Sequence, residues 1–232
     1  MTDTKISVFG AKVGMMNPDA LKAAMTQSAA LGGRQEGSFI NFSGKRGVYE
    51  IGIEKRDTDN DECWLVNVAS FEDGYICWKG GAPQATRLYP MGSAIPALDR
   101  TEHGPFVKDG DGWFDAKAMV IKSLDNDEQG YFKINSVSGV SSVADLQREI
   151  TAKMVSDEAY WPVVNLRREQ FTAKGFKNSK PIFHVVGWLS DEAVEMLADE
   201  DDTHSLKELF AMSGDTPILP IEGKVAKGRR AL

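Results

Sequence analysis

Residues 113–137 read WFDAKAMVIKSLDNDEQGYFKINSV, two runs of alternating apolar and polar side chains around an acidic turn. A period of two is typical of half-buried strands, and the turn between the runs predicts an antiparallel pair. In the second run, Phe132 and Ile134 are expected to face the core. Tyr131 and Lys133 then lie together on the outer face of the sheet.

A helix and two further strands are predicted to follow this pair. Ser142 and Asp145 resemble a capping box at the start of the helix. The predicted buried stripe of the helix comprises Val143, Leu146, Ile150 and Met154. Residues 161–171, WPVVNLRREQF, and 181–188, PIFHVVGW, are expected to form the last two strands, joined by a polar loop. The order strand, strand, helix, strand, strand fits a small Greek-key barrel, and an OB-fold has its helix in this place.

The chain before this region is expected to add a hairpin, a third strand and a long excursion. Residues 47–54, GVYEIGIE, and 62–68, ECWLVNV, alternate around a polar turn and predict an antiparallel hairpin. Residues 74–78, GYICW, predict a third strand. Residues 79–112 are rich in Gly and Pro, and a loop of that length is usually functional or disordered.

These patterns predict a mainly β protein with peripheral helices, an OB-fold-like antiparallel Greek-key barrel with extensions. The barrel domain is expected to span residues 45–190. Residues 1–44 are predicted to contain a helix at 17–31 and a mobile linker. Residues 191–232 are predicted to form an acidic helical segment and a basic tail.

The net charge of −7 is unevenly distributed along the chain. Residues 191–208 carry eight acidic side chains against Lys207. The overall acidity therefore permits a local nucleic-acid surface, although it argues against coating duplex DNA by charge alone. Three roles stay open for 191–208: a phosphate mimic that covers a basic groove, a docking surface for replication or recombination proteins, or a solvated helix face. Deletion of residues 191–232 is expected to leave a folded core.

Several classes of function lack the sequence patterns that they require. The apolar runs are too short for a secretory signal or a membrane span, which predicts a cytoplasmic protein. Cys63 and Cys77 belong to no CxxC or Cys/His cluster, so no structural zinc, other metal or cofactor is predicted. The acids of residues 57–62 resemble a calcium loop only in composition, and an exposed turn explains them better. No catalytic motif occurs, although a nuclease built from scattered carboxylates would leave little local signature.

The best candidate site is the predicted loop between the last two strands. Residues 163–181 carry five bases against Glu169, with Phe176 among them. Bases neutralise phosphates, and an exposed ring can stack on a nucleobase for about 1–3 kcal/mol. The two adjoining strands each add an aromatic and a basic side chain. The candidate nucleic-acid-binding residues are Tyr131, Lys133, Trp161, Arg167, Arg168, Lys174, Phe176, Lys177 and Lys180.

Plainer interpretations of these residues remain open. A lysine-rich loop is often only solvated, and Trp161 and Tyr131 can cap the core at the ends of a barrel. Lys133 and Arg167 can serve as strand charges that prevent edge-to-edge aggregation. Exposed aromatics and a long Gly/Pro excursion also suit a protein-binding or virion-associated module. Salt-dependent binding to an oligonucleotide separates these classes, and the sequence leaves open whether the chain forms a homo-oligomer.

A resemblance to a known family supports the nucleic-acid interpretation. The segments WFDAKAMVIKS, GYFKINS and WPVVNLRREQFTAKGFKNSKPIFHVVGWL resemble phage-encoded OB-fold single-stranded-DNA-binding proteins, over about residues 45–190. The resemblance rests on pattern and implies protection of single strands during replication or recombination, without sequence preference. It also implies an acidic C-terminal peptide that recruits partners. This sequence departs there, because its acidic run is internal and its last residues are basic.

Overall fold

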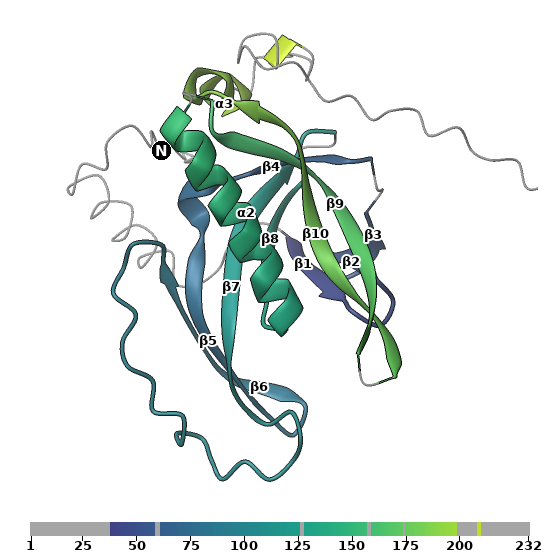
Figure 1. Ribbon diagram of the computed structural model, residues 1–232, viewed down its shortest axis with the longest axis vertical. Coiled ribbons are helices and arrows are strands. Elements are labelled where there is room, and N and C mark those ends of the chain that lie inside the picture. Colours follow the sequence, from purple (N-terminus) through teal and green to yellow (C-terminus); the bar gives the residue numbers. More distant parts are fainter. Residues whose placement is uncertain are drawn as a thin grey trace, which may run out of the picture.

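A computed structural model describes residues 38–58, 61–125, 128–156, 159–173, 175–198 and 208–209. Within these ranges the chain is mainly β, and its strands join in one strongly curled sheet that forms a half-barrel (Figure 1). The predicted helix at 17–31 lies outside the described residues. The predicted mainly β class is confirmed.

The sheet has the strand order β10-β9-β4-β7-β8-β1-β2-β3, and β5 pairs with both β6 and β7. The described pairings are antiparallel, apart from the parallel pair of β1 with β8. The strands are β1 Ser38–Ser43, β2 Val48–Ile51, β3 Arg56–Asp57, β4 Cys63–Val66, β5 Glu72–Lys79, β6 Ala82–Pro90, β7 Gly112–Ser123, β8 Gln129–Ile134, β9 Trp161–Ala173 and β10 Phe176–Leu189. The helices are the 3₁₀ turn Val68–Ser70, α2 Val137–Ser156 and α3 Asp191–Ala198.

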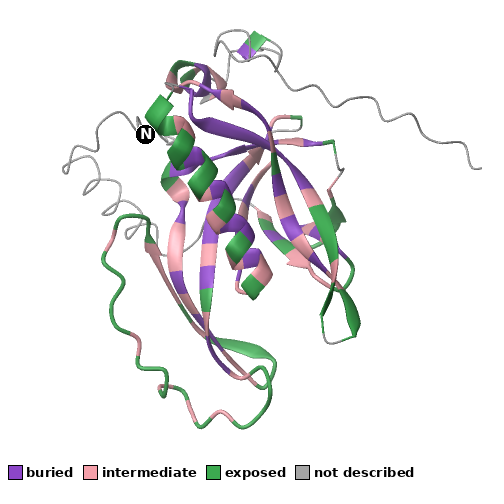
Figure 2. Cartoon of the chain, in the orientation of Figure 1, coloured by how far each residue is buried: buried purple, intermediate pink, exposed green. Residues whose placement is uncertain are grey.

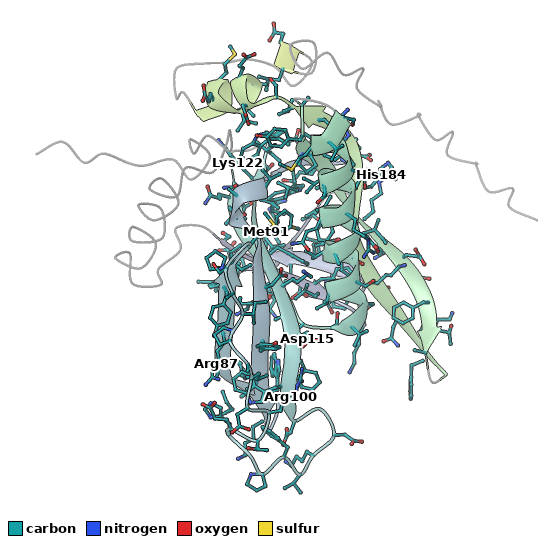
Figure 3. The ribbon with its side chains drawn as sticks, turned by 60° about the vertical axis from the view of Figure 1, so that its left-hand side comes forward. Arg87, Met91, Arg100, Asp115, Lys122 and His184 are labelled. Carbon is teal, nitrogen blue, oxygen red and sulfur yellow. The ribbon has the colours of Figure 1, made fainter. Side chains whose placement is uncertain are left out.

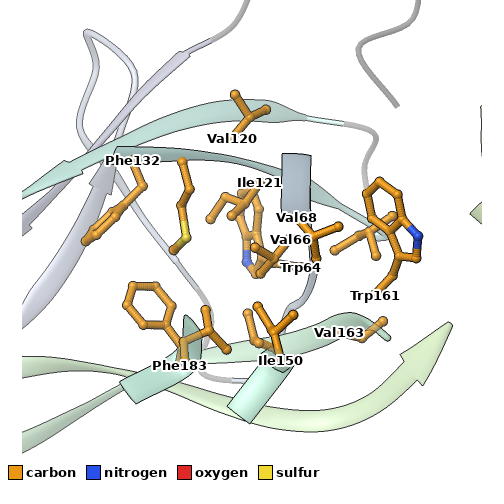
Figure 4. Close-up of a cluster of buried hydrophobic side chains, with 14 of the residues drawn as sticks. Trp64, Val66, Val68, Val120, Ile121, Phe132, Ile150, Trp161, Val163 and Phe183 are labelled. Carbon is orange, nitrogen blue, oxygen red and sulfur yellow. The ribbon is translucent and has the colours of Figure 1, made fainter. Parts of the chain in front are cut away.

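The core lies between the curled sheet and α2. The predicted pairing of β7 with β8 is confirmed, and it turns Phe132 and Ile134 inward. Helix α2 contacts β7 and β10, and its side chains Val143, Leu146 and Ile150 are buried in the core. Figure 4 shows Ile150 among the buried side chains of the sheet. Each buried side chain of this size contributes about 1.5–3 kcal/mol, so the sheet depends on this helix.

Helix α2 begins earlier than the sequence predicted. Ser136 is its capping residue, because its Oγ accepts a hydrogen bond from the Gly139 amide at 3.2 Å. Ser142 instead lies inside the helix and donates its hydroxyl to the Ser138 carbonyl at 2.9 Å. The capping box at Ser142 was therefore wrong. The buried stripe was correct except for Met154, which is 46% exposed.

The first strands pair differently from the prediction. Strand β1 lies in the segment predicted as a linker and joins β2 to β8. Strand β2 pairs with β1 and β3, whereas β4 lies between β7 and β9, so the predicted hairpin of 47–54 with 62–68 was wrong. The physical reason is burial: three of the four β4 residues are fully covered, and a strand buried on both faces belongs in the middle of a sheet.

The predicted excursion at 79–112 contains a strand. Strand β6 pairs along β5, which in turn pairs with the first half of β7, and the three project from the half-barrel (Figure 1). We call these three segments the arm, and residues 91–111, which return along it, the arm loop. The predicted strand at 74–78 is confirmed as part of β5.

The last two strands form a longer hairpin than predicted. Strand β9 continues to Ala173 and β10 starts at Phe176, so the segment predicted as a polar loop is mostly paired. We call the part of β9 and β10 beyond the Arg167–Ile182 pair the hairpin. Most of its residues are exposed because it extends past the core (Figure 2). The arm and the hairpin project on either side of the first turn of α2 (Figure 1).

Tyr49 of β2 and the backbone of the β1–β2 turn contact β9 and β10 and close the sheet there. The buried Tyr49 hydroxyl lies 3.0 Å from the Arg167 carbonyl and 3.2 Å from that of Ile182. The Ser179 amide donates to the Gly44 carbonyl at 2.8 Å. Burial raises the pKa of Tyr49, so its hydroxyl stays a proton donor.

Tyr49→Phe is expected to lower the free energy of unfolding by about 1 kcal/mol, because the hydroxyl hydrogen bond is removed while the ring still packs. Chemical denaturation measures this decrease. Tyr89→Phe, on the arm, is the control for removing a hydroxyl elsewhere. Equal stability of the Tyr49→Phe variant and the parent would show that this closure contributes nothing.

Helix α3 docks at the end of the sheet opposite the hairpin tip. Ser190 caps it, accepting from the Ala193 amide at 3.3 Å. Ala193, Val194 and Leu209 are buried in the main core. The described part of the acidic segment therefore contributes to the core, and the deletion of residues 191–232 remains the test of whether the rest of the core folds without it. Most of the rest of the predicted acidic segment and tail lies outside the described residues.

No helix in the described ranges has both the length and the apolar character needed to cross a membrane.

Candidate nucleic-acid interface

The hairpin presents an exposed ring and an exposed base at its tip. Phe176 is 73% exposed at the first position of β10, and Lys177 follows it, exposed and paired in register with Thr172 (Figure 2). Single exposed apolar side chains are common on protein surfaces, so the ring is a candidate for stacking because basic side chains lie near it, not because it is exposed. Lys174 lies outside the described residues.

A shallow pocket separates the hairpin from the start of α2. Phe171 and Lys180 lie on the same face of the hairpin, two residue pairs apart, and both line the pocket. Its volume is about 460 Å³, and its lining residues are Val137, Ser138, Ser141, Ser142, Asp145, Phe171 and Lys180. We call Phe171, Phe176, Lys177 and Lys180 the hairpin surface. The strand register puts Phe171, Phe176 and Lys180 on one face of the hairpin and Lys177, opposite Thr172, on the other face near the tip.

Three of the predicted basic residues, Arg167, Arg168 and Lys180, make contacts within the protein. Arg168 donates to the Gly47 carbonyl at 2.6 Å, so it serves the closure of the sheet. Arg167 lies 3.8 Å from the Asp61 carboxylate. Lys180 pairs with Glu169 at 3.1 Å across the hairpin. A bound phosphate would have to compete with Glu169 for Lys180, whereas Lys177 has no ion pair among the described residues.

Trp161 does not belong to this surface. It is only 2% exposed, and its Nε1 donates to Asp191 Oδ1 at 2.7 Å. Ten residues of β9 separate it from Phe171, which is about 33 Å at 3.3 Å per residue. Its predicted stacking role is therefore wrong. The alternative interpretation, that Trp161 covers the end of the core, is correct.

Tyr160 adds a second donor to the same carboxylate. Its hydroxyl donates to Asp191 at 2.9 Å, and the pKa of Tyr160 is raised by burial and further by the hydrogen bond to Asp191. The hydroxyl therefore stays protonated, and Asp191 joins the start of α3 to the start of β9.

Tyr131 and Lys133 face outward as predicted, but they lie on a different surface. Strand β8 is separated from β9 by β7 and β4. The Tyr131 hydroxyl donates to Glu72, and its ring lies 6.2 Å from that of Phe39 in an edge-on arrangement. The nine predicted residues thus do not form one site. We call Phe39, Tyr131 and Lys133 the β8 surface.

Two aromatic side chains near these surfaces were absent from the predicted site. Phe171 was assigned only to a strand, although its place opposite Asn178 puts it in the pocket. Phe39 is 57% exposed and lay in the predicted linker. The alternation of SFINFS at residues 38–43 was the available signal for a strand there.

The acidic stretch at residues 57–62 is partly structural. Glu62 is buried, lies 3.3 Å from Arg56, and accepts the Ser123 hydroxyl at 3.0 Å. Arg56 also pairs with Glu128 at 2.6 Å. The arginine therefore compensates the buried carboxylate. Among the described residues no group of three or more His, Cys, Asp and Glu side chains is arranged to hold a metal ion.

Comparison with known proteins gives no relative: no family model, no curated protein and no solved structure matches this chain.

Proposed function

We propose that the protein binds single-stranded DNA without sequence preference and acts in DNA replication or recombination, as the resemblance to phage proteins implies. The observation that carries the proposal is the hairpin surface, where Phe176 is exposed at the tip beside Lys177 and Phe171 shares a pocket with Lys180. Rings stack on bases of any sequence, and lysines contact phosphates, which suits nonspecific binding.

The chain order of the central elements supports an OB-like description of the half-barrel. Strands β4, β7 and β8 precede α2, and β9 and β10 follow it. This is the element order of an OB-fold, in which the loop joining the last two strands is one wall of the binding groove. Here that position is taken by the tip of the hairpin. The additional strands β1, β2 and β3 and the arm are departures from the pattern.

Single strands suit the described surface better than duplex DNA. A protein that recognises duplex DNA presents basic side chains along the element that enters the groove. The exposed face of α2 instead mixes Arg148 with Asp145 and Glu149. On the hairpin, the basic side chains of Lys177 and Lys180 are interspersed with Glu169 and with aromatic rings. Fluorescence anisotropy with a labelled oligothymidylate and with a duplex of equal length tests this preference. Equal affinity for both forms, or no affinity for the single strand, would contradict the proposal.

Lys177→Ala and Lys180→Ala are each expected to lower the salt slope of single-strand binding by about 0.7, because a protein with one phosphate-neutralising lysine fewer releases fewer counterions on binding. Binding titrations across a series of salt concentrations measure the slope. Lys122→Ala is the control, since Lys122 lies at the far end of β7 from the hairpin (Figure 3). An unchanged slope in both hairpin variants would place the phosphate path elsewhere.

A further inference from the structure

The arm loop is attached to the arm through Glu102 and His103, and separately through Arg100, which donates to the Trp113 carbonyl at 2.9 Å and to Asp115 at 3.2 Å. The Arg87 guanidinium lies over the Trp113 ring, 4.9 Å from its centre, and pairs with Glu102 Oε1 at 2.6 Å. Trp113 Nε1 donates to the Glu102 carbonyl at 3.0 Å. The His103 ring lies 5.7 Å from the Trp113 ring, inclined by 50°. Trp113 therefore contacts an arginine, an imidazole and a backbone acceptor.

The groups beneath the loop come from paired strands of the arm. Arg87, labelled in Figure 3, is on β6. Trp113, which is 5% exposed, follows the first residue of β7, and Lys79 ends β5. Lys79 Nζ donates to the His103 carbonyl at 2.8 Å. Arg87, Lys79 and Trp113 thus all contact the two consecutive loop residues Glu102 and His103. Strand pairing fixes their spacing independently of the loop.

We propose that Glu102 and His103 occupy a binding site for one nucleotide of a single strand, a proposal that rests on the proposed function. The Glu102 carboxylate lies where a phosphate would accept from Arg87. The His103 imidazole lies against the ring on which a base would stack. When the loop withdraws, Lys79 is released from the His103 carbonyl and can approach the same phosphate.

The chemistry of each contact supports the replacement of these two loop residues by a nucleotide. A carboxylate and a phosphate are both acceptors for the planar guanidinium, which stays charged. The hydrogen bond from Arg87 to Glu102 raises the pKa of Arg87 further. Indole rings stack on bases without regard to sequence, and Trp113 also holds the Arg87 guanidinium in place.

The arm loop is held mainly by polar contacts that a nucleotide can replace. Its larger apolar side chains include Met91, Ile95 and Val107, which are 44%, 43% and 83% exposed. Withdrawal of the loop uncovers the Trp113 ring, which is 5% exposed beneath it, and a base that stacks on this ring covers the same apolar area again. Solvent-accessible ion pairs such as Arg87–Glu102 contribute little to stability in water. A phosphate of a single strand can therefore replace the Glu102 carboxylate at Arg87 at little cost in free energy.

Variants of the two loop residues test the site in the full chain. Glu102→Gln removes the carboxylate charge and keeps the backbone acceptor. His103→Gly removes the imidazole at a position whose φ of 67° glycine adopts without strain. The double variant is expected to bind a fluorescein-labelled oligothymidylate about fivefold more tightly or better, the lower range for one added stacking contact. Adding Arg87→Ala is expected to abolish the gain.

The binding titration is carried out in the parent and in a Phe176→Ala/Lys177→Ala background, which separates this site from the hairpin. A gain in both backgrounds supports the arm site, even if the parent itself fails to bind. No gain in either background overturns it, even if the parent binds through the hairpin. Melting curves accompany each variant, and the near-isosteric Glu102→Gln single variant must by itself show part of the gain. If the Glu102→Gln variant is folded but binds the oligothymidylate no more tightly than the parent, the proposal is also overturned.

Discussion

Trp161→Ala is expected to lower the free energy of unfolding by about 3–5 kcal/mol, the usual cost of truncating a large buried aromatic. The Trp161 ring is 2% exposed within the main core (Figure 4). The change also removes the donor that reaches Asp191 at 2.7 Å. Helix α3 would then be attached to the sheet less firmly. Chemical denaturation followed by circular dichroism measures the effect.

Trp188→Ala is the matched control for this change. Trp188 lies at the same end of the sheet but is only half-buried, with the Lys153 ammonium 5.7 Å from its ring. Its truncation is expected to cost clearly less. If Trp161→Ala left stability intact and instead weakened binding to single strands, Trp161 would return to the nucleic-acid interface, and its assignment to the core would be wrong.

Local alternation predicted the central strands well because each of them has one buried face. In β8, Phe132 and Ile134 face the core while Tyr131 and Lys133 face outward, and this burial follows the alternation of side chains in the sequence. The amphipathic stripe of α2 was readable for the same reason. Its start was not, since Ser136 and Ser142 are equally plausible caps and only the position of the preceding strand decides between them.

The pairing partners could not be read from local pattern. Strand β4 is nearly continuous in apolar residues, which shows that it is buried on both faces but not which strands flank it. The parallel pairing of β1 with β8 joins segments far apart in the sequence, at Phe39 and Tyr131. The two aromatics of the β8 surface therefore meet through topology alone.

The hairpin was mistaken for a loop because its outer part has no buried face. Lys177 pairs with Thr172 and Lys180 with Glu169, and neither pair shows an apolar alternation. The sequence still located the residues that dominate the hairpin surface, Phe176 among them. It misjudged Trp161 because a tryptophan beside a basic strand looks the same whether its ring faces water or the core.

Phe176→Ala is expected to weaken single-strand binding by about 1–3 kcal/mol, or about 5- to 150-fold, because the variant has no ring at the hairpin tip to stack on a base. The salt slope should stay close to that of the parent, since the change removes no charge. The ring is 73% exposed, so its removal should leave the free energy of unfolding nearly unchanged. Anisotropy titrations at several salt concentrations, with melting curves beside them, measure all three quantities.

Phe39→Ala provides the matched control, because Phe39 is 57% exposed but lies on the β8 surface rather than on the hairpin. If the hairpin carries the binding, Phe39→Ala retains the affinity of the parent. The opposite result, weaker binding with Phe39→Ala and unchanged binding with Phe176→Ala, would move the interface to the β8 surface with Tyr131 and Lys133. If both variants bind as the parent does, neither exposed ring stacks on a base. The hairpin would then be a solvated extension of the sheet, held in place by Tyr49 and Arg168.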